Sequence, residues 1–530
     1  MNRRMKQILC AALAGTLLLS GCGSNASQTK AAAVTTPDDN YRTYCEVFVR
    51  SYSDGNSDGI GDLKGLTQKL GYLSETGFTG VWLMPICKSP SYHKYDVTDY
   101  CSIDPEYGTM KDFETFLAAA HKKGIRVILD FVMNHTSSQH PWFQQAVTYL
   151  KSLPKGAKPD SSKCPYVAYY NFHRANEPQA NDRLLAGTEW AYEGVFSSHM
   201  PDLNLSNPAV KKEMEKAAGF WLSKGVDGFR LDAAKEYFSG NSEKSTEVLR
   251  WFTKYVKSRK KNAYLVAEVW DTLPEIQGYY KSGIDSIFNY PFGDSSGQII
   301  KTVNSGNALA AQKYVKNLIS AQDYLAQANP NMIDAPFLSN HDVGRIAGFV
   351  GGDEAKCKLA GAMNLTMSGS AFVYYGEELG MKGSGDDPSK RAPMYWDTKA
   401  SGGMTQPPPG CTVPQHPFGS YAQQETDSNS VYQYYRKAIA LRTKYPEVAR
   451  GKVSAVSALS SGSVCAVRKR WKQESCVILY NIGPSSVKVP LTSSDASSLH
   501  LQDFLVTGKD TVTQSGKELV MPPLSVAVLK

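Results

Sequence analysis

Short apolar runs rich in β-branched and aromatic residues alternate with segments of helical periodicity between residues 44 and 376. Several of these runs lack a strict alternation of apolar and polar positions, which is typical of parallel strands buried on both faces. The strand candidates are residues 45–52, 78–85, 125–133, 226–232, 263–270, 286–292, 334–342 and 371–378. Because eight strands that alternate with helices close most simply into a ring, the pattern predicts an α/β fold, a (β/α)8 barrel.

Two parts of the chain depart from this pattern. The third strand candidate ends near Asn134, but the fourth begins only near Val226, and the chain between them is rich in Pro, Tyr, Asn and Gly. After a predicted helix over 431–445, short alternating strands with Ser/Gly turns follow, which indicates an antiparallel β domain. The predicted domains are a barrel over 41–134 and 203–450, an inserted subdomain over 135–202 and a C-terminal β-sandwich domain over 451–530.

The amino terminus predicts export. A short basic stretch precedes the apolar run 8–19, which is too short for a stable membrane span, so residues 1–21 are predicted to be a signal peptide. The sequence LSGC, which ends at Cys22, resembles a bacterial lipobox and implies a lipid on that cysteine; the alternative is an ordinary signal peptide with an incidental cysteine. Residues 22–40 then form a predicted flexible tether. We expect a lipoprotein on the extracellular face of the cell membrane.

Composition narrows the class of protein. The 530 residues exceed one ordinary core, and 42% hydrophobic, 20% charged and 11% aromatic residues indicate a globular protein. The formal charge of +8 comes from scattered Lys and Arg, which argues against a nucleic-acid partner. We expect a monomer.

An exported chain can oxidise its cysteines. Eight cysteines follow Cys22. Cys465 and Cys476 lie in a predicted hairpin, where a cross-strand bridge is plausible, and Cys87 and Cys101 flank a short loop and are a second possible pair. For the other four cysteines, buried thiols are the alternative to disulfides.

Polar side chains gather at the carboxyl ends of the strand candidates, where the active site of a barrel lies. Arg230 and Asp232 end the fourth strand, and Glu268 ends the fifth in apolar company. A neighbouring guanidinium keeps a carboxylate ionised, whereas apolar surroundings keep a carboxyl group protonated. One acid of each kind is what the cleavage of a glycosidic bond requires.

The motifs around these residues resemble those of glycoside hydrolase family 13, the α-amylase family. DFVMNH (130–135), GFRLDAAKE (228–236), EVWD (268–271) and LSNHD (338–342) look like its catalytic-region motifs, and GFTGVWLMPI (77–86), MPDLN (200–204) and VYYGEELGM (373–381) look like supporting ones. The resemblance covers roughly residues 41–450. It implies that Asp232 is the nucleophile, Glu268 the acid/base and Asp342 a carboxylate that engages sugar hydroxyls and helps to hold Glu268 protonated.

The same resemblance implies further contacts with the glucosyl unit. Arg230 orients Asp232, and Tyr95 is a stacking platform for the sugar. The remaining substrate contacts that it implies are His93, Asp130, His135, Lys235, His341 and Arg391. A retaining mechanism follows if the two catalytic carboxyl groups lie about 5–5.5 Å apart.

A glycine-rich loop, DGNSDGIGD, follows the first strand. Asp54, Asn56, Asp58 and Asp62 recur at odd spacing, so their oxygens and the backbone oxygen of Ile60 can converge on a hard cation. The loop resembles the calcium loop of the oligo-1,6-glucosidase branch of the family and implies structural Ca²⁺; a solvated acidic turn is the alternative.

Two features of the sequence bear on specificity. The motif MPDLN is intermediate between the oligo-1,6-glucosidase and neopullulanase branches, and the small Ala233 leaves room for an α-1,4-linked leaving sugar. We therefore expect hydrolysis of α-1,4 bonds in starch-derived glucans and maltooligosaccharides. The alternatives are an α-glucosidase or oligo-1,6-glucosidase, a neopullulanase or cyclomaltodextrinase, and a surface glucan-binding lipoprotein that has lost catalysis.

Overall fold

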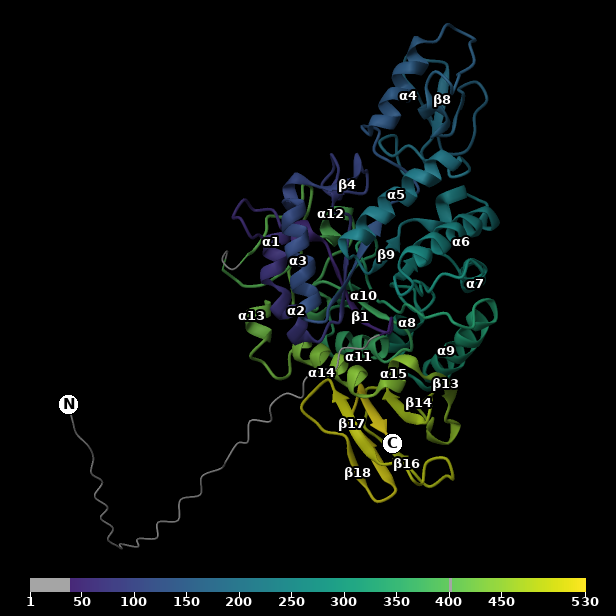
Figure 1. Cartoon of the computed structure of the whole chain (residues 1–530). Coiled ribbons are helices and arrows are strands. Elements are labelled where there is room, and N and C mark those ends of the chain that lie inside the picture. The colour runs from purple at the N-terminus through teal and green to yellow at the C-terminus, as the bar shows by residue number, and fades with distance from the viewer. Residues whose placement is uncertain (1–38, 400–402) are drawn as a thin grey trace, which may run out of the picture. The chain divides into compact units, whose positions relative to one another are not determined.

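The computed structural model describes residues 39–399 and 403–530 (Figure 1). The predicted signal peptide, the lipidation site Cys22 and nearly all of the tether lie outside these residues. Within the described part of the chain, no helix combines the length and the apolar character needed to cross a membrane.

A seven-stranded sheet, in the order β11-β10-β9-β5-β2-β1-β12, forms the centre of the fold. Every pairing in this sheet is parallel. Its strands are β1 (Thr43–Val47), β2 (Gly80–Leu83), β5 (Arg126–Phe131), β9 (Gly228–Leu231), β10 (Tyr264–Ala267), β11 (Ser286–Ile287) and β12 (Ala371–Tyr374). Each strand overlaps one of the predicted strand segments.

The segment 334–337 closes the ring between β11 and β12. Ala335 forms a parallel bridge with Phe288, directly after β11. On the other side, the amide of Phe372 in β12 donates a hydrogen bond of 2.9 Å to the carbonyl oxygen of Pro336. Pro336 has no N–H to donate in return, which explains why this eighth segment is not a regular strand. The predicted (β/α)8 barrel is confirmed.

Aromatic side chains fill the inside of the ring. The ring of Tyr44 stacks on Tyr264 and Phe372, with centroids 5.4 and 4.9 Å apart. Trp82 and Phe288 are buried in the same cluster. This packed layer supports the strand ends at which the polar residues gather.

Helices follow the strands of the sheet (Figure 1). The longer ones are α3 (Met110–Lys122), α5 (Pro208–Lys224), α6 (Ser242–Arg259), α9 (Ala308–Ala328), α11 (Glu354–Leu365) and α14 (Val431–Lys444). The shorter ones are α1 (Leu63–Gln68), α2 (Leu70–Thr76), α7 (Leu273–Tyr280), α8 (Gln298–Ser305), α10 (Ile346–Phe349), α12 (Asp387–Lys390), α13 (Tyr421–Gln424) and α15 (Pro446–Arg450). Helix α5 shows how sequence sets the ends: the side chain of Asn207 caps it and Gly225 ends it in a left-handed conformation.

The chain between β5 and β9 forms small elements of its own. Helix α4 (Pro141–Ser152) is followed by an antiparallel sheet in the order β6-β8-β7, made of β6 (Phe172–Arg174), β7 (Asp182–Leu184) and β8 (Trp190–Glu193). A bridge between His135 and Asp202 joins the two ends of this insertion. A separate hairpin, β3 (Cys87–Lys88) and β4 (Asp99–Ile103), follows β2.

The C-terminal part consists of two antiparallel sheets with their own buried core. The first sheet, in the order β13-β14-β15-β20-β17, contains β13 (Lys452–Ala455), β14 (Val464–Trp471), β15 (Glu474–Asn481), β17 (Leu501–Val506) and β20 (Ser525–Leu529). The second sheet, in the order β16-β19-β18, contains β16 (Val487–Pro490), β18 (Thr513–Ser515) and β19 (Glu518–Met521). The predicted antiparallel C-terminal β domain is confirmed.

The cross-strand bridge proposed for this domain is wrong. In the register of β14 and β15, Cys465 lies opposite Tyr480, whereas Cys476 lies four residues nearer the turn. All the cysteines among the described residues are free thiols, and Cys87 and Cys101 are no exception. The sequence placed both cysteines in the hairpin, but only the position of its tight turn fixes which residues face each other.

Candidate active site

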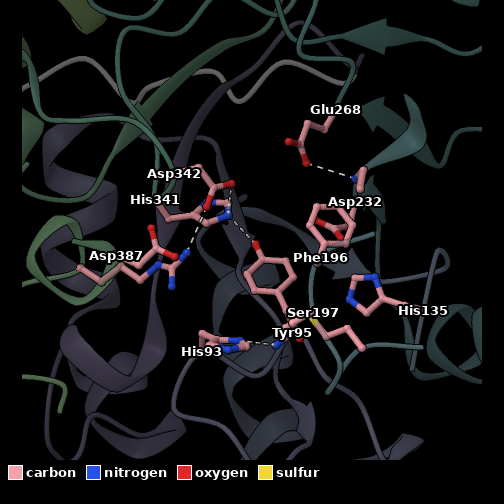
Figure 2. A pocket seen from close by; sticks show the side chains of 13 residues that line it. His93, Tyr95, His135, Phe196, Ser197, Asp232, Glu268, His341, Asp342 and Asp387 are labelled. Atoms are coloured by element: carbon pink, nitrogen blue, oxygen red, sulfur yellow. Dashed lines mark hydrogen bonds and ion pairs between the residues drawn. The ribbon is translucent and has the colours of Figure 1, made fainter. Parts of the chain in front are cut away.

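A cavity of about 380 Å³ lies at the carboxyl ends of the barrel strands (Figure 2). Its lining residues are His93, Tyr95, His135, Phe196, Ser197, Met200, Asp232, Ala233, Glu268, His341, Asp342, Asp387 and Arg391. The structure therefore brings all three predicted catalytic carboxyl groups together in one cavity. It also places five of the predicted substrate contacts around them.

One guanidinium joins the two central acids of the cavity. Nη1 of Arg230 donates to Oδ1 of Asp232, and Nη2 donates to Oε2 of Glu268, both at 2.5 Å. Arg230 is 1% exposed, so both contacts are shielded from water. One planar guanidinium thus holds both carboxyl groups beside each other. The prediction that Arg230 orients Asp232 omitted its second contact, with Glu268.

The environment of Glu268 favours its protonated form. Burial raises the pKa of Glu268 to about 7; Arg230 opposes this rise, and the charges of Asp232 and Asp342 add to it. The backbone N–H of Ala233, which donates to Oε2 of Glu268 at 3.1 Å, also opposes the rise. A carboxyl group that holds its proton near neutral pH is suited to donate that proton to a leaving group.

Asp342 has the opposite character. Although burial opposes it, the positive charges of His341 and Arg391 hold the pKa of Asp342 well below its usual range. Nη2 of Arg391 donates to Oδ1 of Asp342 at 3.0 Å, and Nε2 of His341 lies 3.0 Å from Oδ2. Asp342 is therefore a fixed negative charge in the cavity wall, and this charge supports the raised pKa of Glu268.

Two histidines of the lining are neutral. Burial lowers the pKa of His135, and burial lowers that of His93 to about 4. Nδ1 of His93 accepts the backbone N–H of Tyr95 at 3.1 Å, which leaves Nε2 to carry the ring proton. Nε2 of His135 is buried and has no hydrogen-bond partner among the described residues. Both rings can therefore bond a sugar hydroxyl.

Asp130, predicted as a substrate contact, lies beneath the cavity instead. Its side chain is 0% exposed. It accepts hydrogen bonds from Nη1 of Arg230 at 2.9 Å, from the hydroxyl of Tyr95 at 2.9 Å and from Nε1 of Trp82 at 3.2 Å. Its oxygens are thus occupied, and it positions Arg230 and Tyr95 rather than touching a sugar. The ring of Tyr95 itself lines the cavity, where a stacking platform was predicted.

Lys235 is also outside the lining. It lies in the short helical turn Ala234–Phe238, which follows Asp232. Its Nζ pairs with Oδ2 of Asp271 at 2.8 Å, and its side chain is 44% exposed. Lys235 thus stays a predicted substrate contact.

The sequence patterns marked none of Phe196, Ser197 and Asp387, and they marked Met200 only as the first residue of the MPDLN motif. Phe196, Ser197 and Met200 come from the loop after β8, and Asp387 comes from α12. Phe196 is 47% exposed, and its ring lies 5.2 Å from that of His135. The three residues from the loop after β8 reach the cavity because the inserted chain folds back onto the barrel, a tertiary contact that no local pattern encodes.

The predicted calcium loop bonds mainly to itself. Oδ1 of Asp54 accepts the backbone N–H of Asn56 at 3.0 Å, and Oδ1 of Asp58 accepts that of Ile60 at 2.7 Å. The side chain of Asp62 caps helix α1. All the predicted donors are oxygens, as Ca²⁺ prefers.

The arrangement of these oxygens does not by itself form a metal centre. Across residues 39–399 and 403–530, no group of three or more His, Cys, Asp or Glu side chains is placed to hold a metal ion. The chemistry of the loop therefore fits a hard cation, but its geometry here does not establish one.

Comparisons with known proteins place the cavity in context. The family model "Alpha amylase, catalytic domain" matches residues 46–451. The chain is 37% identical over 490 residues to Alpha-amylase 3 of Dictyoglomus thermophilum, and this match covers 92% of each chain. It is 35% identical to a 4-alpha-glucanotransferase of Thermotoga neapolitana over 67% of this chain and 76% of that protein. The solved structure of Eubacterium rectale Amy13B superposes with a TM-score of 0.90 at 43% identity, over 93% of this chain and 96% of that one.

Proposed function

Because this chain belongs to the α-amylase family of glycoside hydrolases, we propose that it hydrolyses α-1,4 bonds in starch-derived glucans and maltooligosaccharides. The observation that carries the mechanism is the Arg230 bridge, which holds Asp232 and Glu268 at one wall of a sugar-sized cavity. In this proposal Asp232 is the nucleophile and Glu268 the acid/base.

The first step forms a covalent intermediate. A carboxylate oxygen of Asp232 attacks the anomeric carbon while the bond from that carbon to the leaving oxygen breaks. Glu268 gives its proton to the leaving oxygen, so the shortened glucan departs as an alcohol. Arg230 keeps Asp232 ionised for the attack, and the raised pKa of Glu268 keeps the proton in place.

The second step regenerates the enzyme. Glu268, now a carboxylate, takes a proton from water, and the resulting hydroxide attacks the same carbon. The ester bond to Asp232 breaks, and the sugar leaves with its original anomeric configuration. The relative named 4-alpha-glucanotransferase indicates that a sugar hydroxyl can take the place of water on a related scaffold. We assign water here because the match to Alpha-amylase 3 covers 92% of this chain, whereas the match to the transferase covers 67%.

The choice of bond rests on the leaving side of the cavity. Ala233 lines it directly after the nucleophile, and its single methyl group leaves room for an α-1,4-linked leaving sugar. The experiment is product analysis with amylose, pullulan, isomaltose and a cyclodextrin. Mixed maltooligosaccharides released rapidly from amylose support the proposal; glucose released chiefly from isomaltose overturns it in favour of an oligo-1,6-glucosidase.

We also propose that the loop 54–62 binds structural Ca²⁺. Its donors are all oxygens, which suits that ion. Binding to the folded state alone raises the unfolding temperature. We expect calcium to raise the melting temperature of the wild type after treatment with a chelator, and to have no effect on an Asp54→Asn/Asp58→Asn double variant. Equal melting curves of the wild type with and without calcium would remove the proposal.

Finally, we propose that the mature protein is anchored at the outer face of the membrane through a lipid on Cys22. The basis is the LSGC sequence after a short apolar run. Metabolic labelling with a fatty-acid analogue tests this, with Cys22→Ser as the matched control. A labelled wild type and an unlabelled control support the anchor; equal labelling, or none in either, rejects it.

A further inference from the structure

A buried acid lies behind the histidine of the cavity wall. Glu46 belongs to β1 and is 1% exposed, and its Oε1 lies 2.6 Å from Nδ1 of His341. The sequence pattern marked Glu46 only as a strand residue, and it does not line the cavity. A carboxylate inside a barrel requires a partner, because burying it unpaired costs several kcal/mol.

The imidazole of His341 lies between two carboxyl groups. Its Nδ1 faces Glu46, and its Nε2 lies 3.0 Å from Oδ2 of Asp342 and 2.7 Å from the hydroxyl of Tyr95. Both ring nitrogens therefore face acceptors, an arrangement that only the doubly protonated ring satisfies fully. Consistent with this, Asp342 and Glu46 raise the pKa of His341 to about 9, although its burial opposes the rise.

The other groups around Glu46 do not take over this role. The guanidinium of Arg230 is bound to Asp130, Asp232 and Glu268. Burial raises the pKa of the Cys45 thiol and of the Tyr374 phenol, so both neighbours are neutral.

We propose that Glu46 is a positioning residue that holds His341 as an imidazolium, and that this cation fixes Asp342 in its ionised form at the cavity wall. The effect reaches the chemistry in one more step, since the charge of Asp342 helps to keep the proton on Glu268. The chain of contacts runs from β1 through the imidazole to the cavity. The catalytic part of this inference rests on the proposed function.

The test is a direct titration of His341. Wild type, Glu46→Gln and Glu46→Asp proteins are labelled with ¹³C at histidine Cε1 and followed by NMR between pH 5 and 10, with His341→Gln to assign the signal. We expect the His341 signal of the wild type to titrate near pH 9. In Glu46→Gln its pKa should fall by about one unit or more, a tenfold or larger change in proton affinity. In Glu46→Asp, which keeps the charge, the pKa of His341 should lie between those of the wild type and Glu46→Gln.

Kinetics supply the second readout. Glu46→Gln should lower kcat on maltooligosaccharides by about tenfold or more, with a smaller change in KM. The alkaline limb of its pH–activity profile should become steeper, because His341 now loses its proton in the assayed range. Glu378→Gln is the matched control: Glu378 is equally buried, but it accepts from Tyr72 and does not contact His341. Its pH profile should follow that of the wild type.

Two results would overturn the assignment. One is a wild-type His341 that titrates at or below pH 6.5, which needs no variant to fold. The other is a folded Glu46→Gln protein with an unchanged His341 titration. A wild type that hydrolyses no α-glucan but shows the expected titrations would refute the proposed function and still support the link between Glu46 and His341.

Discussion

The backbone amide of Ala233 donates a hydrogen bond of 3.1 Å to Oε2 of Glu268. Ala233 has φ of 44°, a left-handed conformation that residues with a side chain rarely adopt. The strained turn after β9 thus directs the amide that follows the proposed nucleophile onto the proposed acid. Such strain persists only where the surrounding structure enforces it.

Substitutions at Ala233 distinguish the effect of its left-handed backbone from the effect of its side-chain size. Ala233→Gly adopts the same φ without a Cβ penalty, so its free energy of unfolding should stay within about 1 kcal/mol of the wild type and its kcat should be retained. Ala233→Val should unfold more easily by about 1–2 kcal/mol and lose kcat/KM on maltooligosaccharides. Denaturant unfolding and steady-state kinetics measure both. Equal behaviour of the two variants would show that the turn is not strained.

Arg230 should tolerate no replacement. Lysine keeps the charge, but it cannot bond Asp232 and Glu268 at the same time as the planar guanidinium does. We expect Arg230→Lys to lower kcat by about 100-fold or more and to reduce stability by about 3 kcal/mol, because buried carboxylates lose their partner. Arg391→Lys is the comparison, since Arg391 contacts one catalytic carboxylate only. If Arg230→Lys kept a tenth or more of the activity, the bridge would not be needed.

The pKa of Glu268 sets the alkaline side of the activity profile. Its carboxyl group is protonated below about pH 7 and loses the proton above it. The value of kcat/KM for maltooligosaccharides should therefore fall as pH rises through 7. With α-glucosyl fluoride, whose leaving group needs no proton, the first step should lose this limb, and Glu268→Gln should retain most of that step. An identical alkaline limb for both substrates would assign it to another group.

The sequence predicted which three carboxyl groups share the cavity, because a barrel brings the ends of its strands together. Asp232, Glu268 and Asp342 each follow a strand segment, and the closed sheet brings them into one cavity. The same rule failed for Asp130, since it also ends a strand but points under the cavity floor. Residues such as Phe196 escaped prediction because their place depends on how a long insertion folds back. The pairing of the hairpin cysteines was wrong because the register of the two strands depends on the turn.

A buried acid away from the cavity makes stability depend on pH. Glu377 is fully buried; burial raises its pKa to about 8, while hydrogen bonds from Ser339 and Tyr435 oppose the rise. A raised pKa in the folded state means that stability is fully present below the unfolded pKa, about 4.5, and is lost as pH rises towards 8. Glu377→Gln should remove this part of the loss. Urea unfolding at pH 5 and pH 8.5 measures it.

The expected sign is specific. Relative to the wild type, Glu377→Gln should gain stability between the lower and the higher pH. Above the unfolded pKa the wild type must take up a proton at Glu377 on folding, whereas the glutamine takes up none. A difference in unfolding free energy that is the same at both pH values would show that Glu377 is ionised in the folded protein even at pH 5.

In the proposed mechanism, Asp232 attacks the sugar. The most direct measurement is mass spectrometry of peptides from the wild type after reaction with a 5-fluoro-α-glucosyl fluoride, which slows the breakdown of a covalent intermediate. We expect one added fluoroglucosyl group, on the peptide that contains Asp232 and on that side chain. A label on any other residue, or turnover of the reagent with release of the β anomer, would contradict it.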